Sequence, residues 1–195
     1  MIQFLFTLGN VLEVRDEDGM TALMQSVFMY RDGHVRGWLP IFKFLMEQHP
    51  NLEDVDRFGD TVVFDAVGNP NLEFLTDLIA AGANINHADV HGNTPLIEAC
   101  IGGFTEAVRC LLGPGNGPNG CDLDHVDATG DSAIHTALKR GHVAIVKMLC
   151  DKGASLDQED EDGRTSLEIA VDRGDPVLIN VIRDAIDARL LAQPV

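Results

Sequence analysis

Five eight-residue segments of this 195-residue chain share one order of residues: Asp, Gly three positions later, Thr or Ser two further on, and an apolar residue two beyond that. The segments are DEDGMTAL, DRFGDTVV, DVHGNTPL, DATGDSAI and DEDGRTSL. They start at residues 16, 56, 89, 127 and 160, so two intervals are 33 residues and the other two are longer. A unit of this size cannot bury an apolar face alone, so the repetition predicts stacked units with a shared core.

Each repeat contains the signals of two short helices joined by a turn. A hydroxyl residue stands where the first helix begins, and its side chain can accept hydrogen bonds from unpaired N–H groups of the first turn. These predicted caps are Thr21, Thr61, Thr94, Ser132 and Thr165. Small residues that allow close approach of the first helices are Ala66, Ala99, Ala137 and Ala170. Gly82 and Gly153 are predicted to end second helices in the left-handed conformation.

The pattern resembles the ankyrin repeat, in which D-x-x-G-x-T-P-L-H opens each unit and G-A-D-V-N closes it. The resemblance covers nearly the whole chain. It implies an all-α repeat solenoid, in which helix-turn-helix units joined by β-hairpins or turns stack into a curved array with a concave groove. We expect a single domain over residues 1–195, with a half repeat at 1–15 and repeats that start at 16, 56, 89, 127 and 160. Insertions are expected near 30–36 and 113–121.

The two ends of the predicted array differ in polarity. Residues 1–15 align with the second half of a repeat, and Ile2, Phe4 and Phe6 would present an apolar end. This predicts either upstream repeats in a longer array or dimerisation at the N-terminal end. The two closing helices carry more interleaved polar residues, which is typical of a capping repeat with one wettable face.

A glycine-rich stretch in the second insertion has the spacing of a dinucleotide-binding loop, since Gly115, Gly117 and Gly120 read G-x-G-x-x-G. That fingerprint requires a strand before it and a helix after it. Here a helix precedes and a hairpin follows, and no Lys or Arg lies between Arg109 and Lys139. The stretch is therefore interpreted as a surface loop, and no cofactor is predicted.

The net charge and the spacing of the cysteines restrict the kinds of function that the chain can have. The formal net charge of -17 disfavours nucleic acid and anionic membrane surfaces, because their phosphates would be repelled. No apolar stretch reaches membrane-spanning length. The four cysteines form no C-x-x-C pair, so we expect free thiols and a reducing compartment, the cytoplasm or the nucleus. His87 and His91 are four apart in a hairpin rather than on a helix, and no metal site is predicted.

No catalytic constellation is evident, so the chain is predicted not to be an enzyme. Ankyrin-like proteins bind partners through hairpin tips and the exposed side of their first helices, and the resemblance implies a protein-binding scaffold of this kind. The alternative is a regulatory ankyrin domain excised from a larger multidomain enzyme or channel. Carried over position by position, the candidate partner-binding residues are Met20, Phe28, Met29, Phe58, Asp60, Val90, His91, Asn93, Ile101, Asp131, Glu161 and Asp162.

Two features of these candidates have alternative interpretations. The apolar members lie in the first three repeats, and they predict either a partner or an insertion that folds over Phe28 and Met29. The leading Asp of each repeat is expected to bond the turn backbone. The acid beyond it, such as Asp157, Glu161 and Asp162, either provides solubility or attracts a Lys/Arg-rich segment of a partner.

Overall fold

The computed structural model describes residues 12, 14–31, 37–113 and 120–192. Its contacts divide the chain into two compact units, residues 1–90 and 91–195, and each unit is described by itself. The expected half repeat, and with it the apolar N-terminal end, lies almost wholly outside the described residues. So do the centres of both expected insertions. That all five repeats form one array stays a prediction.

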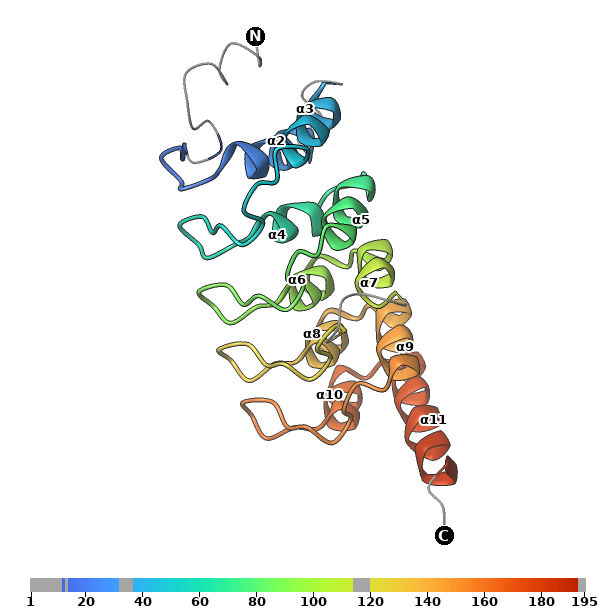
Figure 1. The fold of residues 1–195 in the computed structure, drawn as a ribbon. Coiled ribbons are helices and arrows are strands. Elements are labelled where there is room, and N and C mark those ends of the chain that lie inside the picture. The colour runs from blue at the N-terminus through green and yellow to red at the C-terminus, as the bar shows by residue number, and fades with distance from the viewer. Residues whose placement is uncertain (1–11, 13, 32–36, 114–119, 193–195) are drawn as a thin grey trace. The chain divides into compact units, whose positions relative to one another are not determined.

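Unit 1, residues 1–90, contains two helix-turn-helix pairs. Its helices are α2 (Ala22–Arg31), α3 (Trp38–Met46), α4 (Val62–Val67) and α5 (Glu73–Ala80). Helix α2 packs on α3 and α4, and α4 packs on α5 (Figure 1). The rings of Phe42 and Phe74 are fully buried and meet edge to face, with 4.9 Å between their centroids. This aromatic contact ties the second helices of the two pairs together.

Unit 2, residues 91–195, contains three such pairs. Its helices are α6 (Pro95–Gly102), α7 (Thr105–Leu111), α8 (Ala133–Arg140), α9 (Val143–Lys152), α10 (Ser166–Arg173) and α11 (Pro176–Ala192). The first helices α6, α8 and α10 pack in series, and so do the second helices α7, α9 and α11 (Figure 1). The core between them is apolar, and Ile134, Leu138 and Leu149 are completely buried.

The Asp that opens a repeat organises the hairpin before each first helix. At the starts of the first, second, fourth and fifth repeats, one carboxylate oxygen accepts hydrogen bonds from the backbone N–H groups two and four residues later, at 2.8–3.0 Å. These residues are Asp16, Asp56, Asp127 and Asp160. Among the residues with assigned structure, the hairpins contain only isolated antiparallel bridges, Arg15–Thr21 and Val126–Ser132. The repeated Asp is therefore structural.

The helix ends follow the expected chemistry at most positions. The hydroxyls of Thr21 and Thr94 accept from the N–H groups of the residues three later, at 3.3 and 3.4 Å. The hydroxyls of Thr61 and Ser132 differ, because both are buried and find no hydrogen-bond partner within the described part of the chain. Gly82 and Gly153 have φ angles of 87° and 93°, which confirms the two predicted left-handed ends. The alanines of the first helices, Ala66, Ala99, Ala137 and Ala170, are all fully buried.

Backbone hydrogen bonds tie successive hairpins within each unit. In unit 1 the N–H of Val90 donates to the carbonyl of Phe58 at 3.1 Å, and in unit 2 that of Ala128 donates to His91 at 2.9 Å. Histidine side chains add further contacts between successive hairpins. Nε2 of His87 lies 3.0 Å from the carbonyl of Gly59, and Nε2 of His125 lies 3.0 Å from that of Gly92. A carbonyl oxygen only accepts, so each imidazole donates from Nε2.

The hairpin glycines give a first testable prediction. Gly92 has a φ of 78°, and a Cβ at this position would lie 2.9 Å from the N atom of Ala128. Gly153 also has a positive φ, 93°, but a Cβ there would meet nothing within 4 Å. We expect Gly153→Ala to cost about 1 kcal/mol through backbone strain alone, and Gly92→Ala to cost about 2–3 kcal/mol. Equilibrium urea unfolding measures both, and equal losses would contradict the close approach of the two hairpins.

Candidate functional site

In unit 1, the second hairpin and the start of the third carry neighbouring exposed apolar side chains. Phe58 is 46% exposed and Val90 is 64% exposed. They belong to successive hairpins and are joined by the backbone hydrogen bond from Val90 to Phe58. Gly59 keeps the tips close, since a Cβ on it would lie 3.2 Å from Cγ1 of Val90. The structure thus brings together two of the predicted partner-binding residues on one surface of unit 1.

Arg57 adds a cation to this surface. The carbon at the centre of its guanidinium group lies 4.6 Å from the centroid of the Phe58 ring. The same guanidinium group is 2.5 Å from a carboxylate oxygen of Asp18 on the preceding hairpin. A stacked and ion-paired arginine restricts the position of the aromatic ring that it covers. The sequence also places Arg57 at a groove-facing position of its repeat, next to the candidate Phe58.

Phe28 and Met29 lie on α2, which packs against α4. Phe28 is 37% exposed, and Met29 is half-buried. The alternative that the insertion covers them concerns residues 32–36, which lie outside the described residues. Asp60 is half-buried, and its backbone N–H donates to the carboxylate of Asp56.

Met20 requires a correction, because the sequence predicted it to be exposed. It is buried at 8% exposure. Its backbone N–H donates to Asp16, and its sulfur atom lies 3.6 Å from the side-chain nitrogen of Gln25. A long, flexible thioether side chain loses contact with water when it folds back over its own hairpin and helix. Met20 therefore belongs to the interior of unit 1.

The candidates at the start of unit 2 form a less apolar surface. His91 is exposed, and Asn93 and Ile101 are half-buried. The backbone carbonyl of His91 accepts from Ala128, so this tip is held by the next hairpin. The position of Phe58 is occupied here by His91.

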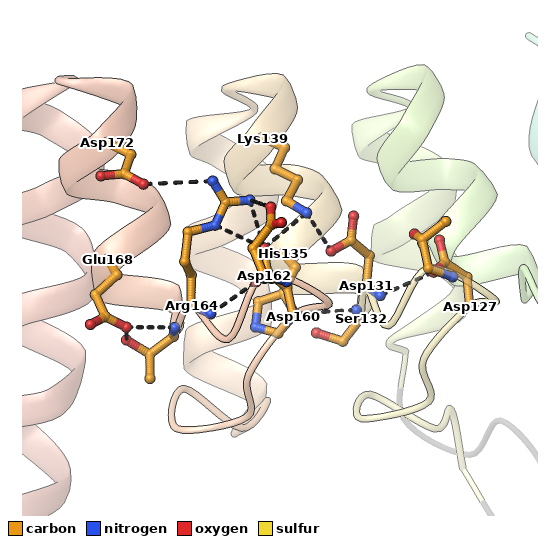
Figure 2. A network of polar contacts seen from close by, with 12 residues as sticks. Asp127, Asp131, Ser132, His135, Lys139, Asp160, Asp162, Arg164, Glu168 and Asp172 are labelled. Carbon is orange, nitrogen blue, oxygen red and sulfur yellow. Dashed lines mark hydrogen bonds and ion pairs between the residues drawn. The ribbon is translucent and has the colours of Figure 1, made fainter.

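A network of opposite charges occupies the first-helix side of the last two repeats (Figure 2). The side chain of Asp160 is completely buried, and it forms ion pairs with Lys139 at 3.0 Å and with Arg164 at 2.8 Å. Lys139 also pairs with Asp131 at 2.6 Å, and Arg164 with Asp162 at 2.8 Å. Lys139 therefore connects the hairpins of the fourth and fifth repeats, whereas Arg164 pairs with acids of the fifth repeat.

The network shifts the pKa of Asp160 and of Lys139 in the direction that keeps each of them charged. Burial alone would raise the pKa of Asp160, but hydrogen bonds from Arg164 and Lys139 outweigh it and hold that pKa well below its usual range. Burial would likewise lower the pKa of Lys139, and its hydrogen bonds to Asp131 and Asp160 raise it instead. Asp160 and Lys139 therefore stay ionised at neutral pH.

The acidic candidates of unit 2 are consequently not equivalent. Asp131 and Asp162 have lysine and arginine partners, so part of their charge is already compensated. Asp160 is buried within the same network and accepts hydrogen bonds from its own hairpin, as expected for the leading Asp of a repeat. Glu161 is exposed, and within the described part of unit 2 it has no ion-pair partner.

The remaining polar and thiol groups have structural surroundings. His135 is fully buried, and its Nε2 lies 3.0 Å from the carbonyl of Gln158. All four cysteines are free, and burial raises the pKa of Cys121 to about 12 and that of Cys150 to about 11. In the described ranges, no group of His, Cys, Asp or Glu side chains is placed to hold a metal ion. The glycine loop, residues 114–119, lies outside those ranges.

The helix-turn-helix pairs and their hairpins identify the class of the fold. A family model for ankyrin repeats (3 copies) matches residues 35–119 and 117–189, which together are more than half of the chain. The chain therefore belongs to the ankyrin repeat family, and its fold is an all-α repeat fold. Ankyrin repeats generally mediate protein–protein interaction. No described helix is both long and apolar enough to cross a membrane.

Several known proteins are similar to parts of this chain. An ankyrin repeat and KH domain-containing protein of Caenorhabditis briggsae is 39% identical over 85 residues, which are 42% of this chain and 3% of that protein. A transient receptor potential cation channel subfamily A member 1 homolog of Caenorhabditis elegans is 37% identical over 103 residues, which are 51% of this chain and 8% of that protein. A putative E3 ubiquitin-protein ligase of Arabidopsis thaliana is 35% identical over 101 residues, which are 49% of this chain and 25% of that protein. The chain thus spans a quarter or less of the length of these relatives.

Proposed function

We propose that this chain is a non-enzymatic protein-binding module, and that the hairpin tips and first helix of unit 1 form an apolar contact surface for a partner protein or peptide. The observation that carries the proposal is the pair of exposed side chains, Phe58 and Val90, on adjoining tips. Partly exposed aromatic side chains held in one position are typical anchors of interfaces. Phe28 on α2 adds a second aromatic ring on the first-helix side of unit 1.

The charge of the chain supports a partner segment rich in Lys or Arg. The formal net charge is -17, and exposed acids without an ion pair in the described residues include Glu17 in unit 1 and Glu161 in unit 2. Such charges speed the encounter with a basic segment, while apolar contacts supply most of the affinity. Asp131 and Asp162 would contribute less, because Lys139 and Arg164 already compensate them.

A second function, that of a regulatory domain within a larger protein, is supported by the relatives. A channel homolog and a putative ubiquitin-protein ligase both contain a segment similar to this chain. The segment is 8% of the length of the channel homolog and 25% of the length of the ligase. In this alternative the same surfaces would contact another domain of one polypeptide. A longer reading frame that contains this sequence would distinguish it from the first function.

Affinity capture from cell extract tests the proposal. The tagged protein is compared with the Phe28→Ser/Phe58→Ser double variant and with Val177→Ser, which removes an exposed apolar side chain from α11. We expect the double variant to lose the captured partner and Val177→Ser to retain it. Capture should fall as salt is raised, because screening at about 0.15 M already limits charge interactions to roughly 8 Å. Equal capture by all three proteins would overturn the assignment of this surface.

The acidic contribution is tested separately by Glu159→Gln/Glu161→Gln, which leaves Asp160 and its ion pairs in place. We expect slower association and a weaker dependence on salt for this variant. An unchanged association rate would show that the acid serves solubility.

A further inference from the structure

The last helix, α11, is longer than the other second helices and presents two different sides. It has 17 residues, whereas α9 has 10. Leu178 and Ile182 form its buried centre. One flank, with Val181, Ala185 and Ala188, faces α9 across a shallow groove that Cys150 also lines. The other flank therefore points away from α9.

This outer flank carries a stripe of apolar residues around one arginine. The residues are Ile179, Arg183, Ile186 and Leu190, at intervals of four, three and four, which place them on one face of an α-helix. Leu190 is 63% exposed, Ile179 and Ile186 are half-buried, and Arg183 is exposed. Leu190 and the accessible parts of Ile179 and Ile186 form one apolar stripe in contact with solvent, and such a stripe has the composition of a contact surface.

The equivalent positions of the fourth repeat differ from these in burial. Val146 of α9 is completely buried, and the residue 33 positions later is Ile179 of α11. Leu138 of α8 is also completely buried, whereas its counterpart Val171 of α10 is 50% exposed. In the fourth repeat these positions are covered by the fifth. In the fifth repeat, no segment in the described ranges covers them.

The charged groups of the stripe are arranged so that two copies would complement each other. Arg183 and Asp187 are one turn apart and exposed, and neither has an ion pair within the residues that the structure describes. When two such helices lie antiparallel, with positions that sum to about 370 facing each other, Arg183 of each copy meets Asp187 of the other. Ile179 then lies opposite Leu190, and Ile186 lies against the aliphatic stem of Arg183. A parallel pair would instead place Arg183 against Arg183.

We propose that the outer face of α11 joins two copies of this chain in a two-fold symmetric, antiparallel helix pair. A self-complementary patch is what a two-fold interface requires, because each residue pair then occurs twice. Val171 of α10 lies at the border of the same face and adds apolar area. An interface of about one helix face is below the roughly 1,200 Å² that separates stable from weak complexes, so the dimer exchanges with monomer.

Analytical ultracentrifugation of the full chain, over a dilution series up to its solubility limit, tests this proposal. The wild type should show a reversible monomer–dimer equilibrium. Arg183→Asp and Asp187→Arg each place like charges opposite each other, so each should raise the dimer dissociation constant about ten-fold or more. The double variant Arg183→Asp/Asp187→Arg restores the complementary order and should dimerise like the wild type. Asp184→Arg, on the flank toward α9, is the control with a matched charge change.

A mixing experiment gives the sharpest outcome. The Arg183→Asp chain carries two acids at these positions and the Asp187→Arg chain carries two arginines, so an equimolar mixture should form heterodimers although neither chain pairs with itself. Circular dichroism checks that each variant keeps its helix content, and Arg183→Ala and Asp187→Ala replace any variant that does not. A monomeric wild type at every concentration, or a dimer unaffected by both single reversals, would overturn the proposal.

Discussion

Replacement of Asp160 with alanine is expected to lower the free energy of unfolding by about 3 kcal/mol. The side chain is completely buried, accepts two backbone N–H groups of its hairpin, and pairs with Lys139 and Arg164. Its removal leaves two cations without their shared anion and a turn without its acceptor. Since both cations retain about a third of their solvent exposure, we place the loss at the lower end of the range for buried pairs.

Asp127→Ala is the matched control, because Asp127 makes the same two turn hydrogen bonds and has no basic partner in the described part of unit 2. It should cost about 1 kcal/mol, the value of the turn bonds alone. Asp160→Asn keeps an acceptor oxygen and should fall between the two. Equal losses for Asp127→Ala and Asp160→Ala in urea unfolding would show that the ion pairs contribute nothing to stability.

The pH dependence of the Asp160 contribution has a defined sign. Its pKa in the folded chain is below the usual range, so the charged form contributes stability at all pH values above the unfolded value of about 3.9. The difference in stability between wild type and Asp160→Asn should therefore be constant at neutral pH. It should shrink as pH falls below about 4 toward the lower pKa of the folded state.

His135→Ala is expected to cost about 3 kcal/mol, because it leaves a cavity in a fully buried site and removes the contact to the Gln158 carbonyl. Nδ1 of the same ring lies 3.4 Å from the backbone N of Ser132. In the neutral imidazole, Nδ1 therefore accepts from Ser132 and Nε2 donates to Gln158. Protonation would remove the acceptor.

Burial lowers the pKa of His135 in the folded chain, while the nearby Asp131 and Asp160 oppose that shift and Lys139 adds to it. The unfolded chain binds the proton first, at a pKa of about 6.5, so stability is lost as pH falls from that value through the lower folded pKa. His135→Gln, which does not titrate, should show a smaller slope of unfolding free energy against pH in this window. Identical slopes for the two proteins would contradict a buried, neutral His135.

Features that depend on local backbone geometry were predictable from the sequence. The opening Asp and Gly of each repeat define a hairpin, and Gly153 ends its helix in the left-handed conformation as expected. Thr94 caps its helix because a hydroxyl at that position reaches the N–H of Ile97. These interactions span a few residues, so the order of residue types determines them.

Features that depend on side-chain reach between repeats were not predictable in the same way. Lys139 contacts an acid of its own hairpin and one of the next repeat, and only the spacing of the hairpins decides that both are within reach. Met20 occupies the position that holds Asp131 in the fourth repeat, yet it turns inward because its side chain is apolar. The exposure of a single position therefore depends on residue type as well as on its place in the repeat.

The central claim is that a partner protein binds the apolar hairpin tips of unit 1, and the affinity of that partner for Phe58→Ser tests it most directly. Calorimetric titration of the captured partner should give a dissociation constant about thirty-fold higher for Phe58→Ser than for the wild type, as for other buried aromatic anchors. Val177→Ser, in unit 2, should bind like the wild type. A dissociation constant for Phe58→Ser within about two-fold of the wild-type value would contradict the claim.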